Sequence, residues 1–319
     1  MDKTIDINEM NLEEKFPGIL DILLMDRTTR KNIIWATDHY GRHGIGYGER
    51  DYIKIELIIR RSGRLIKPRI QKSQSEQKKR SKDMAEVFTP AWVCNKQNNL
   101  IDKEWFGIEG VFNIDVFQGW ITNPKVIFEN KKWQDYVELE RIEITCGEAP
   151  YLTSRYDVVT GSYIEPRNRI GLLDRKIIVV SENIHEKTEW MEYVTIAYKR
   201  IYGFDYQGDN VLLARENLLA TFIDFYKLKF GEEPTFNEIE SIANILSWNI
   251  WQMDGIKFVV PMSCHKEETI QLSLFDEFQE ASEMCRGCRT GNNNQHNGVY
   301  SKIKDWRLNK TVRFIDLVR

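Results

Sequence analysis

The segment Glu140–Leu152 constrains the fold of this chain more than any other stretch, because it reads as a strand, a tight turn at Gly147 and the start of a helix. A Rossmann-like domain is built on this shape: the glycine lets the backbone approach a ligand, and the carboxyl end of the strand opens a crevice. A single glycine after a strand is common, however. Taken alone, the segment is better explained as an ordinary strand-to-helix turn.

Helical and strand-like segments alternate along the rest of the chain. Asp209–Tyr226 places apolar residues three and four apart, Gly231 and Pro234 end this helix, and Phe236–Leu246 restarts the pattern. Asp51–Ile59 alternates in part, as a half-buried strand does. The segments 299–305 and 312–318 are expected to form two short strands around a turn. Helices between short strands predict the α/β class.

The net charge and the length of the apolar runs exclude some classes of function for this chain. The chain has 319 residues with 45 lysines and arginines against 48 acidic residues, a formal charge of −3. A slightly acidic net charge argues against a protein that binds nucleic acid over its whole surface, so any DNA contact is expected to be local. Its apolar runs are far shorter than the ~18 residues that cross a bilayer. With no leader pattern at the N-terminus, we expect a cytoplasmic protein without a membrane partner.

One segment, residues 60–82, is strongly basic. It carries ten lysines and arginines, opposed only by Glu76 and the adjacent Asp83. Such a strip can follow a phosphate backbone, because each cation releases counterions on binding. A solvated linker is the competing interpretation.

The cysteines favour a metal site. Five cysteines make a disulfide framework improbable in a chain without a secretion signal. Cys285 and Cys288 form a CxxC knuckle, which lets two thiolates share one tetrahedral zinc, and Cys264 and His296 complete four ligands. His265 could replace a distant ligand. A redox dithiol or two unrelated thiols remain alternatives. All these residues lie in a polar insertion, residues 262–298, and a structural zinc would hold this insertion in shape.

Four elements in consistent order resemble the DNA adenine methyltransferases, the M subunits, of restriction-modification systems. Ala85–Asp102 resembles that family's "VFTP, then helix" segment, and the Gly147 turn is similar to its "DPACGxGxFL" loop. Asn244–Asp254 is similar to its "NIYGID" segment, and Ile303–Arg307 resembles the strand that follows.

The resemblance implies a Rossmann-like fold that binds S-adenosylmethionine, with an N-terminal extension at residues 1–84, a methyltransferase-like domain at 85–319 and the zinc-loop insertion at 262–298. It implies that Asp254 accepts hydrogen bonds from the ribose, with Asp205, at the end of Ile201–Asp205, as a competing candidate. Asp305 would contact the adenine. The remaining cofactor-binding residues that it implies are Phe88, Thr89, Pro90, Glu143, Cys146 and Gly147.

The family's catalytic tetrapeptide, Asn-Pro-Pro-Tyr, is missing, because all eight prolines are isolated. In the family this motif binds the amino group of the flipped adenine and stacks on its base. The resemblance therefore implies a subunit that is not catalytic alone and acts with a second methyltransferase or restriction subunit. Two alternatives stay open: a zinc-stapled DNA-binding or recruitment protein that has lost the cofactor, and a restriction nuclease subunit.

The pentapeptide Gln271–Phe275 resembles the short peptide by which bacterial DNA-processing proteins dock on the replication sliding clamp. Two leucines and a phenylalanine suit apolar pockets, and Gln271 would add hydrogen bonds. The alternative, which we favour, is that these apolar residues fold back over the zinc loop.

Overall fold

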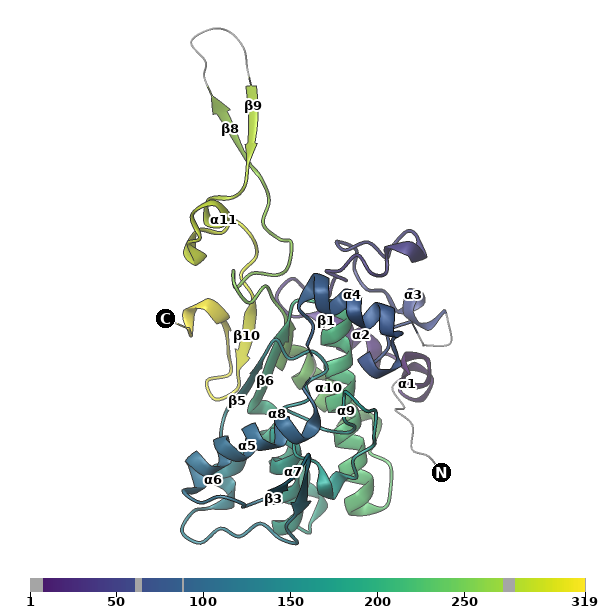
Figure 1. Ribbon diagram of the computed structural model, residues 1–319, viewed down its shortest axis with the longest axis vertical. Helices are drawn as coiled ribbons and strands as arrows, with labels where there is room; N and C mark the ends of the chain where they lie inside the picture. Colours follow the sequence, from purple (N-terminus) through teal and green to yellow (C-terminus); the bar gives the residue numbers. More distant parts are fainter. Residues whose placement is uncertain (1–7, 61–64, 88, 272–278, 319) are drawn as a thin grey trace.

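The computed structural model describes residues 8–60, 65–87, 89–271 and 279–318. In these ranges helices and small sheets are mixed along the chain (Figure 1). The helices are α1 (Glu9–Lys15), α2 (Ile19–Leu24), α3 (Ile55–Ile59), α4 (Gln74–Met84), α5 (Ala91–Phe106), α6 (Trp133–Val137), α7 (Leu172–Asn183), α8 (Lys187–Lys199), α9 (Gly208–Phe230), α10 (Phe236–Asn249) and α11 (Arg286–Thr290). The strands outside the central sheet are β1 (Met25–Asp26), β2 (Lys31–Asn32), β3 (Asn113–Val116), β4 (Gly119–Thr122), β8 (Glu267–Gln271), β9 (Gln279–Glu283), β10 (Lys302–Asp305) and β11 (Lys310–Arg313).

A three-stranded parallel sheet lies at the centre. Its order is β5 (Arg141–Ile144), β6 (Ile201–Asp205) and β7 (Ile250–Gln252). The helices α7 and α8 connect β5 to β6, and α9 and α10 connect β6 to β7. Because all three strands are parallel, their carboxyl ends meet at one edge of the sheet, where ligands bind in folds of this kind.

The two faces of this sheet are covered differently. Ile201 and Ile250 join the large hydrophobic core that the helices form. On the other face, Phe204 and Trp251 pack with Ile303 of the antiparallel β10–β11 hairpin in a second, smaller cluster. The hairpin confirms a pair of strands around a turn near the C-terminus, but the prediction for 312–318 is wrong beyond residue 313, because residues 314–316 form a 3-10 helix. The hairpin pairs with itself and does not extend the parallel sheet.

The helix boundaries between residues 208 and 249 follow local signals and confirm the prediction. Gly231 ends α9 in the left-handed conformation, with φ of 71°. Thr235 begins α10 through a capping box, in which its side chain and that of Glu238 each accept from the other's backbone N–H.

The strand predicted for Asp51–Ile59 is wrong, because residues 55–59 form α3. Ile53, Leu57 and Ile58 are buried. Leu57 and Ile58 reach the core from the helix and Ile53 from the residues just before it, and this packing outweighs the partial alternation.

The N-terminal extension shares the core of the rest of the chain. Ile19, Leu23 and Trp35 belong to the same hydrophobic cluster as the residues of α9 and α10. The fully buried guanidinium of Arg215 in α9 donates to the carbonyl oxygens of Leu23, Met25, Ser247 and Ile250, so it joins the extension to α10 and β7. The predicted boundary at residue 84 therefore does not separate two hydrophobic cores.

The predicted insertion projects from the body of the molecule (Figure 1). It contains the β8–β9 hairpin and α11. Within the described part of the chain, no helix is both long enough and apolar enough to span a membrane.

Candidate functional site

A cavity of about 470 Å³ opens at the carboxyl ends of β5 and β6. Five of the predicted cofactor-binding residues line it: Thr89, Glu143, Cys146, Gly147 and Asp205. Its wall also contains residues that the sequence did not single out, namely Glu86, Tyr151, Tyr206, Gln207 and Asn210. The last three follow β6 directly, and that position was the only signal that could have identified them.

Asp205 holds the turn after β5 against the start of α9. Its carboxylate accepts the N–H of Gly147 at 2.9 Å, the N–H of Gln207 at 3.0 Å and the side-chain amide of Asn210 at 3.4 Å. Gly147 itself has a φ of 54°, a left-handed conformation that glycine adopts without strain. The turn and the end of β6 are thus fixed together at the mouth of the cavity.

Glu143 provides a second buried carboxyl group. It accepts the N–H groups of Tyr151 at 3.3 Å and Leu152 at 3.2 Å. Burial outweighs these donors and raises the pKa of Glu143 to about 8, and the charge of Asp205 acts in the same direction. Burial also raises the pKa of Asp205. A ligand that carries positive charge would favour ionisation of both groups, because it compensates the lost hydration.

Two acceptor atoms in the cavity wall have no partner. Among the described residues, neither Glu86 Oε1 nor Gln207 Oε1 has a hydrogen-bond donor, although both atoms are buried. Because an unsatisfied buried acceptor costs free energy, these atoms mark places where a ligand's hydroxyl or amino group would be stabilised.

The segment before α5 lies partly at this cavity. Thr89 lines it, while Pro90 serves as the N-cap residue of α5 and does not. The prediction for Phe88 falls outside the described residues.

Asp254 and Asp305 do not reach the cavity. Asp254 follows β7, accepts the N–H groups of Ile256 and Lys257 at 3.1 Å and pairs with the Lys257 ammonium at 3.3 Å. It lines a different cavity, beside Cys264 and Cys288. Asp305 accepts two N–H groups in the β10–β11 turn. Both carboxylates close local turns, and of the two candidates for the ribose contact only Asp205 faces the crevice.

Cys264, Cys285, Cys288 and His296 form a cluster that could hold a metal ion, since their ligand atoms all lie within 4.8 Å of one another. The three sulfurs lie 3.7, 3.7 and 3.6 Å from His296 Nδ1. A tetrahedral zinc with ordinary bond lengths would place sulfur and nitrogen ligands roughly 3.6 Å apart. The predicted four ligands thus converge with the spacing of one tetrahedral site, whereas His265 is exposed and lies outside the cluster.

Two glycines make room for this cluster. A Cβ on Gly287 would lie 2.6 Å from His296 Nδ1, and one on Gly298 would lie 3.0 Å from Cys264 Sγ. The N–H of Cys288 donates to Cys285 Sγ at 3.4 Å, an arrangement that stabilises a thiolate. The clamp-like pentapeptide cannot be assessed, because only Gln271 of its five residues lies in the described part of the chain.

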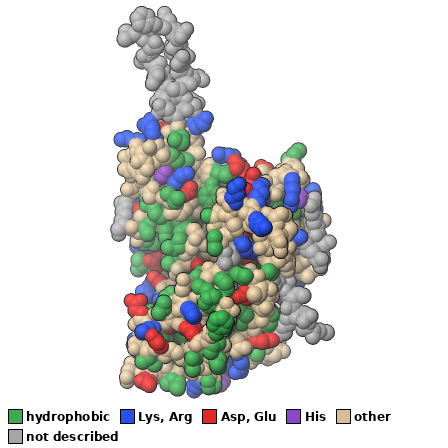
Figure 2. Space-filling view, viewed as in Figure 1, with side chains coloured by type: hydrophobic (Ala, Val, Ile, Leu, Met, Phe, Trp, Pro, Cys, Tyr) green, Lys and Arg blue, Asp and Glu red, His purple; other side chains and the backbone are tan. Residues whose placement is uncertain are grey.

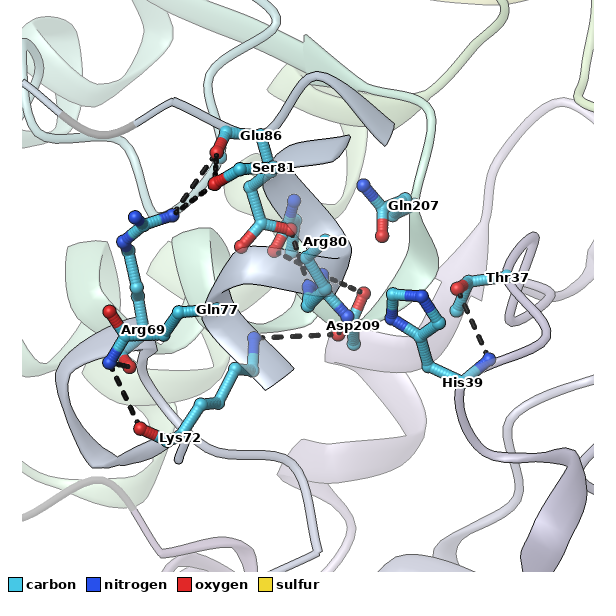
Figure 3. Close-up of polar contacts among 12 residues, drawn as sticks. Thr37, His39, Arg69, Lys72, Gln77, Arg80, Ser81, Glu86, Gln207 and Asp209 are labelled. Carbon is cyan, nitrogen blue, oxygen red and sulfur yellow. Dashed lines mark hydrogen bonds and ion pairs between the residues drawn. The ribbon is translucent and has the colours of Figure 1, made fainter. Parts of the chain in front are cut away.

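Residues 74–82 of the basic strip lie in the helix α4, while residues 61–64 of the strip lie outside the described part of the chain. Arg80 of this helix is buried and bonds to Glu86 at 2.5 Å and to Asp209 at 2.7 Å (Figure 3). Its guanidinium also donates to Asn210 at 3.2 Å. Glu86 and Asn210 line the crevice, so α4 supports the crevice wall from behind.

Comparison with known proteins gave no match to a protein-family model, to a curated protein or to a solved structure.

Proposed function

We propose that this chain is an S-adenosylmethionine-binding, DNA methyltransferase-like subunit of a restriction-modification or related DNA-processing system. The observation that carries the proposal is the convergence of Gly147, Glu143 and Asp205 on one cavity at the carboxyl ends of two parallel strands. Thr89 reaches the same cavity from a segment far upstream. Glu143 and Gly147 come from one motif of the family resemblance, Thr89 from the upstream motif and Asp205 from the competing candidate for the ribose contact.

The cavity fits the proposed cofactor in size and in chemistry. Its volume of about 470 Å³ lies within the range of small-molecule sites. Gln207 and Glu86 offer the free acceptors described above, and Asp205 accepts three bonds where a carboxylate has about four acceptor positions. Ribose hydroxyls and an ammonium group are donors that match these atoms. The carboxyl groups of Glu143 and Asp205 would favour the positive charge of a sulfonium compound.

When bound, S-adenosylmethionine supplies an activated methyl group, and this chain's residues would hold and orient it. Asp205 and Gln207 would accept from the ribose, while the Gly147 turn allows close approach of the backbone. No Asn-Pro-Pro-Tyr sequence is present to bind a flipped adenine. Methyl transfer to DNA is therefore assigned to an assembly with a second subunit that provides this motif.

The cluster of Cys264, Cys285, Cys288 and His296 is assigned a structural zinc. All four positions of a tetrahedral ion are filled by protein ligands, which leaves no open position for a substrate. The metal would hold α11 and the base of the β8–β9 hairpin together.

Calorimetry with S-adenosylmethionine tests the proposal. Asp205→Asn should weaken binding by about 1 kcal/mol, roughly fivefold, because one charged acceptor is lost at the crevice. The matched variant Asp254→Asn makes the same change in the carboxylate that follows β7, the neighbouring strand. It should leave the affinity for the cofactor unchanged. Circular dichroism of both variants checks that the fold is retained.

A weaker affinity in Asp254→Asn alone would move the ribose contact to the other carboxylate. Absence of binding by the unmodified chain at millimolar cofactor would reject the proposal. The alternative would then be a DNA-binding or recruitment protein whose inserted loop is held by a structural metal. The cysteine-histidine cluster supports this alternative independently of the crevice.

A further inference from the structure

A second cavity, of about 390 Å³, is lined by Glu76, Lys79 and Arg80 of α4, whereas only the last residue of this helix, Met84, lines the crevice. It is formed between the loop at residues 38–43 and the segment that runs from residue 65 into α4. Figure 2 shows lysine and arginine side chains gathered over this part of the surface, with acidic side chains among them. The charged residues that line the cavity are Asp38, Arg42, Lys67, Lys72, Glu76, Lys79 and Arg80, together with His39 and His43.

Lys72 is the most informative residue of this cavity. It is 9% exposed, and its Nζ has no hydrogen-bond partner among the described residues. The nearest carboxylate oxygen, Asp209 Oδ2, is 3.7 Å away and already accepts from Arg80 Nη1 at 2.7 Å and the Tyr40 hydroxyl at 2.9 Å. A buried ammonium with unfilled donors costs free energy unless a ligand supplies acceptors.

His39 offers a second unfilled position in the same wall. Its side chain is 11% exposed, and Nε2 has no hydrogen-bond partner within the described residues, although Asp38 Oδ1 lies 3.8 Å away. Figure 3 shows His39 and Lys72 on either side of Asp209. Burial lowers the pKa of His39, the positive charges of Arg80 and Lys79 lower it further, and the carboxylates of Asp38 and Asp209 act in the opposite direction. Lys72 Nζ and His39 Nε2 are thus two buried nitrogen atoms that can donate to an anion in this cavity.

Buried acidic residues compensate the buried cations of the wall, so the uncompensated positive charges lie at the mouth. Glu148, whose pKa burial raises, also lies near Lys72. Arg80 and Lys72 are matched by Glu86 and Asp209. Arg42 pairs with Glu76 at 2.6 Å. Lys67 and Lys79 are exposed and form no ion pair within the described part of the chain. The remaining carboxylate of the lining, Asp38, lies 3.8 Å from His39 Nε2.

We propose that this cavity binds a phosphate group, held by Lys72 and His39 in the wall and by Lys67 and Lys79 at the mouth. The backbone of a DNA strand is the source that the geometry favours, and this choice rests on the proposed function. Arg80 lines the phosphate cavity while its partners Glu86 and Asn210 line the cofactor crevice, so one ion network separates the two. A strand anchored by one phosphate here passes beside the crevice.

Two matched double variants test the proposal in the full chain. Lys67→Gln with Lys79→Gln removes the two cations at the mouth. Lys78→Gln with Lys82→Gln makes the same charge change on exposed residues of α4 that do not line the cavity. Anisotropy of a labelled DNA duplex, measured over a series of salt concentrations, gives the affinity and its salt slope.

The mouth variant should bind the duplex roughly tenfold more weakly, and its slope of log affinity against log salt should fall by about 1 for each phosphate that the protein no longer neutralises. The matched variant should lie close to the unmodified chain. Lys72→Met probes the buried donor in the same assay. Because Lys67 and Lys79 are exposed, the double variant keeps the test valid even if Lys72→Met does not fold.

Titration with inorganic phosphate, followed by the NMR signals of His39, distinguishes the two sources. Loss of duplex affinity in the mouth variant alone assigns the cavity to a backbone phosphate. Phosphate binding that shifts His39 and is abolished in the mouth variant, with unchanged duplex affinity, assigns it to a free phosphate compound. Equal weakening by both double variants, or no response to either probe, would overturn the proposal. Calorimetry with S-adenosylmethionine in the same variants reports separately on the crevice.

Discussion

Two buried carboxyl groups, Glu9 of α1 and Glu216 of α9, have no hydrogen-bond donor among the described residues. Burial raises the pKa of Glu9 to about 8, and burial and the charge of Glu9 raise the pKa of Glu216. In the unfolded chain both groups lose their protons near pH 4.5, so between that pH and about 8 the folded state binds more protons. The free energy of unfolding should therefore fall as pH rises through this range. Glu216→Gln should raise the free energy of unfolding by at least about 1 kcal/mol at about pH 8, because it removes a buried charge. It should have little effect at about pH 4. Urea denaturation at both pH values measures this, with Glu189→Gln, an exposed glutamate of α8, as the control. An equal effect of Glu216→Gln at both pH values would contradict the explanation.

At the scale of elements, the β8–β9 hairpin and α11 form a projection with the cluster of Cys264, Cys285, Cys288 and His296 at its base. We expect the purified chain to contain one zinc, and the double variant Cys285→Ser with Cys288→Ser to lose it, because two of four ligands are removed. Cys94→Ser, at a buried cysteine of α5 outside the cluster, should retain the metal. Chelation should accelerate hydrogen exchange across residues 264–298 while α7 to α10 stay protected, since these helices have their own core. Less than about half an equivalent of zinc, or equal exchange with and without chelator, would reject the structural role.

At the scale of the whole molecule, the N-terminal extension and the parallel sheet share one core, which Arg215 ties together through four carbonyl oxygens. Arg215→Met should lower the free energy of unfolding by about 3 kcal/mol or more, because it leaves several buried acceptors unsatisfied. The matched variant Arg313→Met removes an exposed arginine and should change stability by less than about 0.5 kcal/mol. Hydrogen exchange in increasing urea should show α2 and α10 opening in a single step. Opening of α2 at lower urea, with α10 still protected, would show that the extension is an independent unit.

The features that the sequence alone determined depend on neighbours along the chain. The boundaries of α9 and α10 follow from apolar spacing, Gly231 and the Thr235 capping box, all of which act within one or two turns. The metal cluster was predictable because a CxxC pair already sets two ligands at the required separation.

The tertiary structure decided what depends on contacts between distant segments. It turned residues 55–59 into a helix, since packing against the core outweighs weak alternation. It placed Asp205 at the crevice and Asp254 in a local turn, because strand order and the positions of strand ends set which carboxylate faces the ligand. It also buried Arg80 of the basic strip beside Asp209, 129 residues away in sequence. A charge can be counted from the sequence, but its partners and its desolvation arise only when the fold brings remote groups into contact.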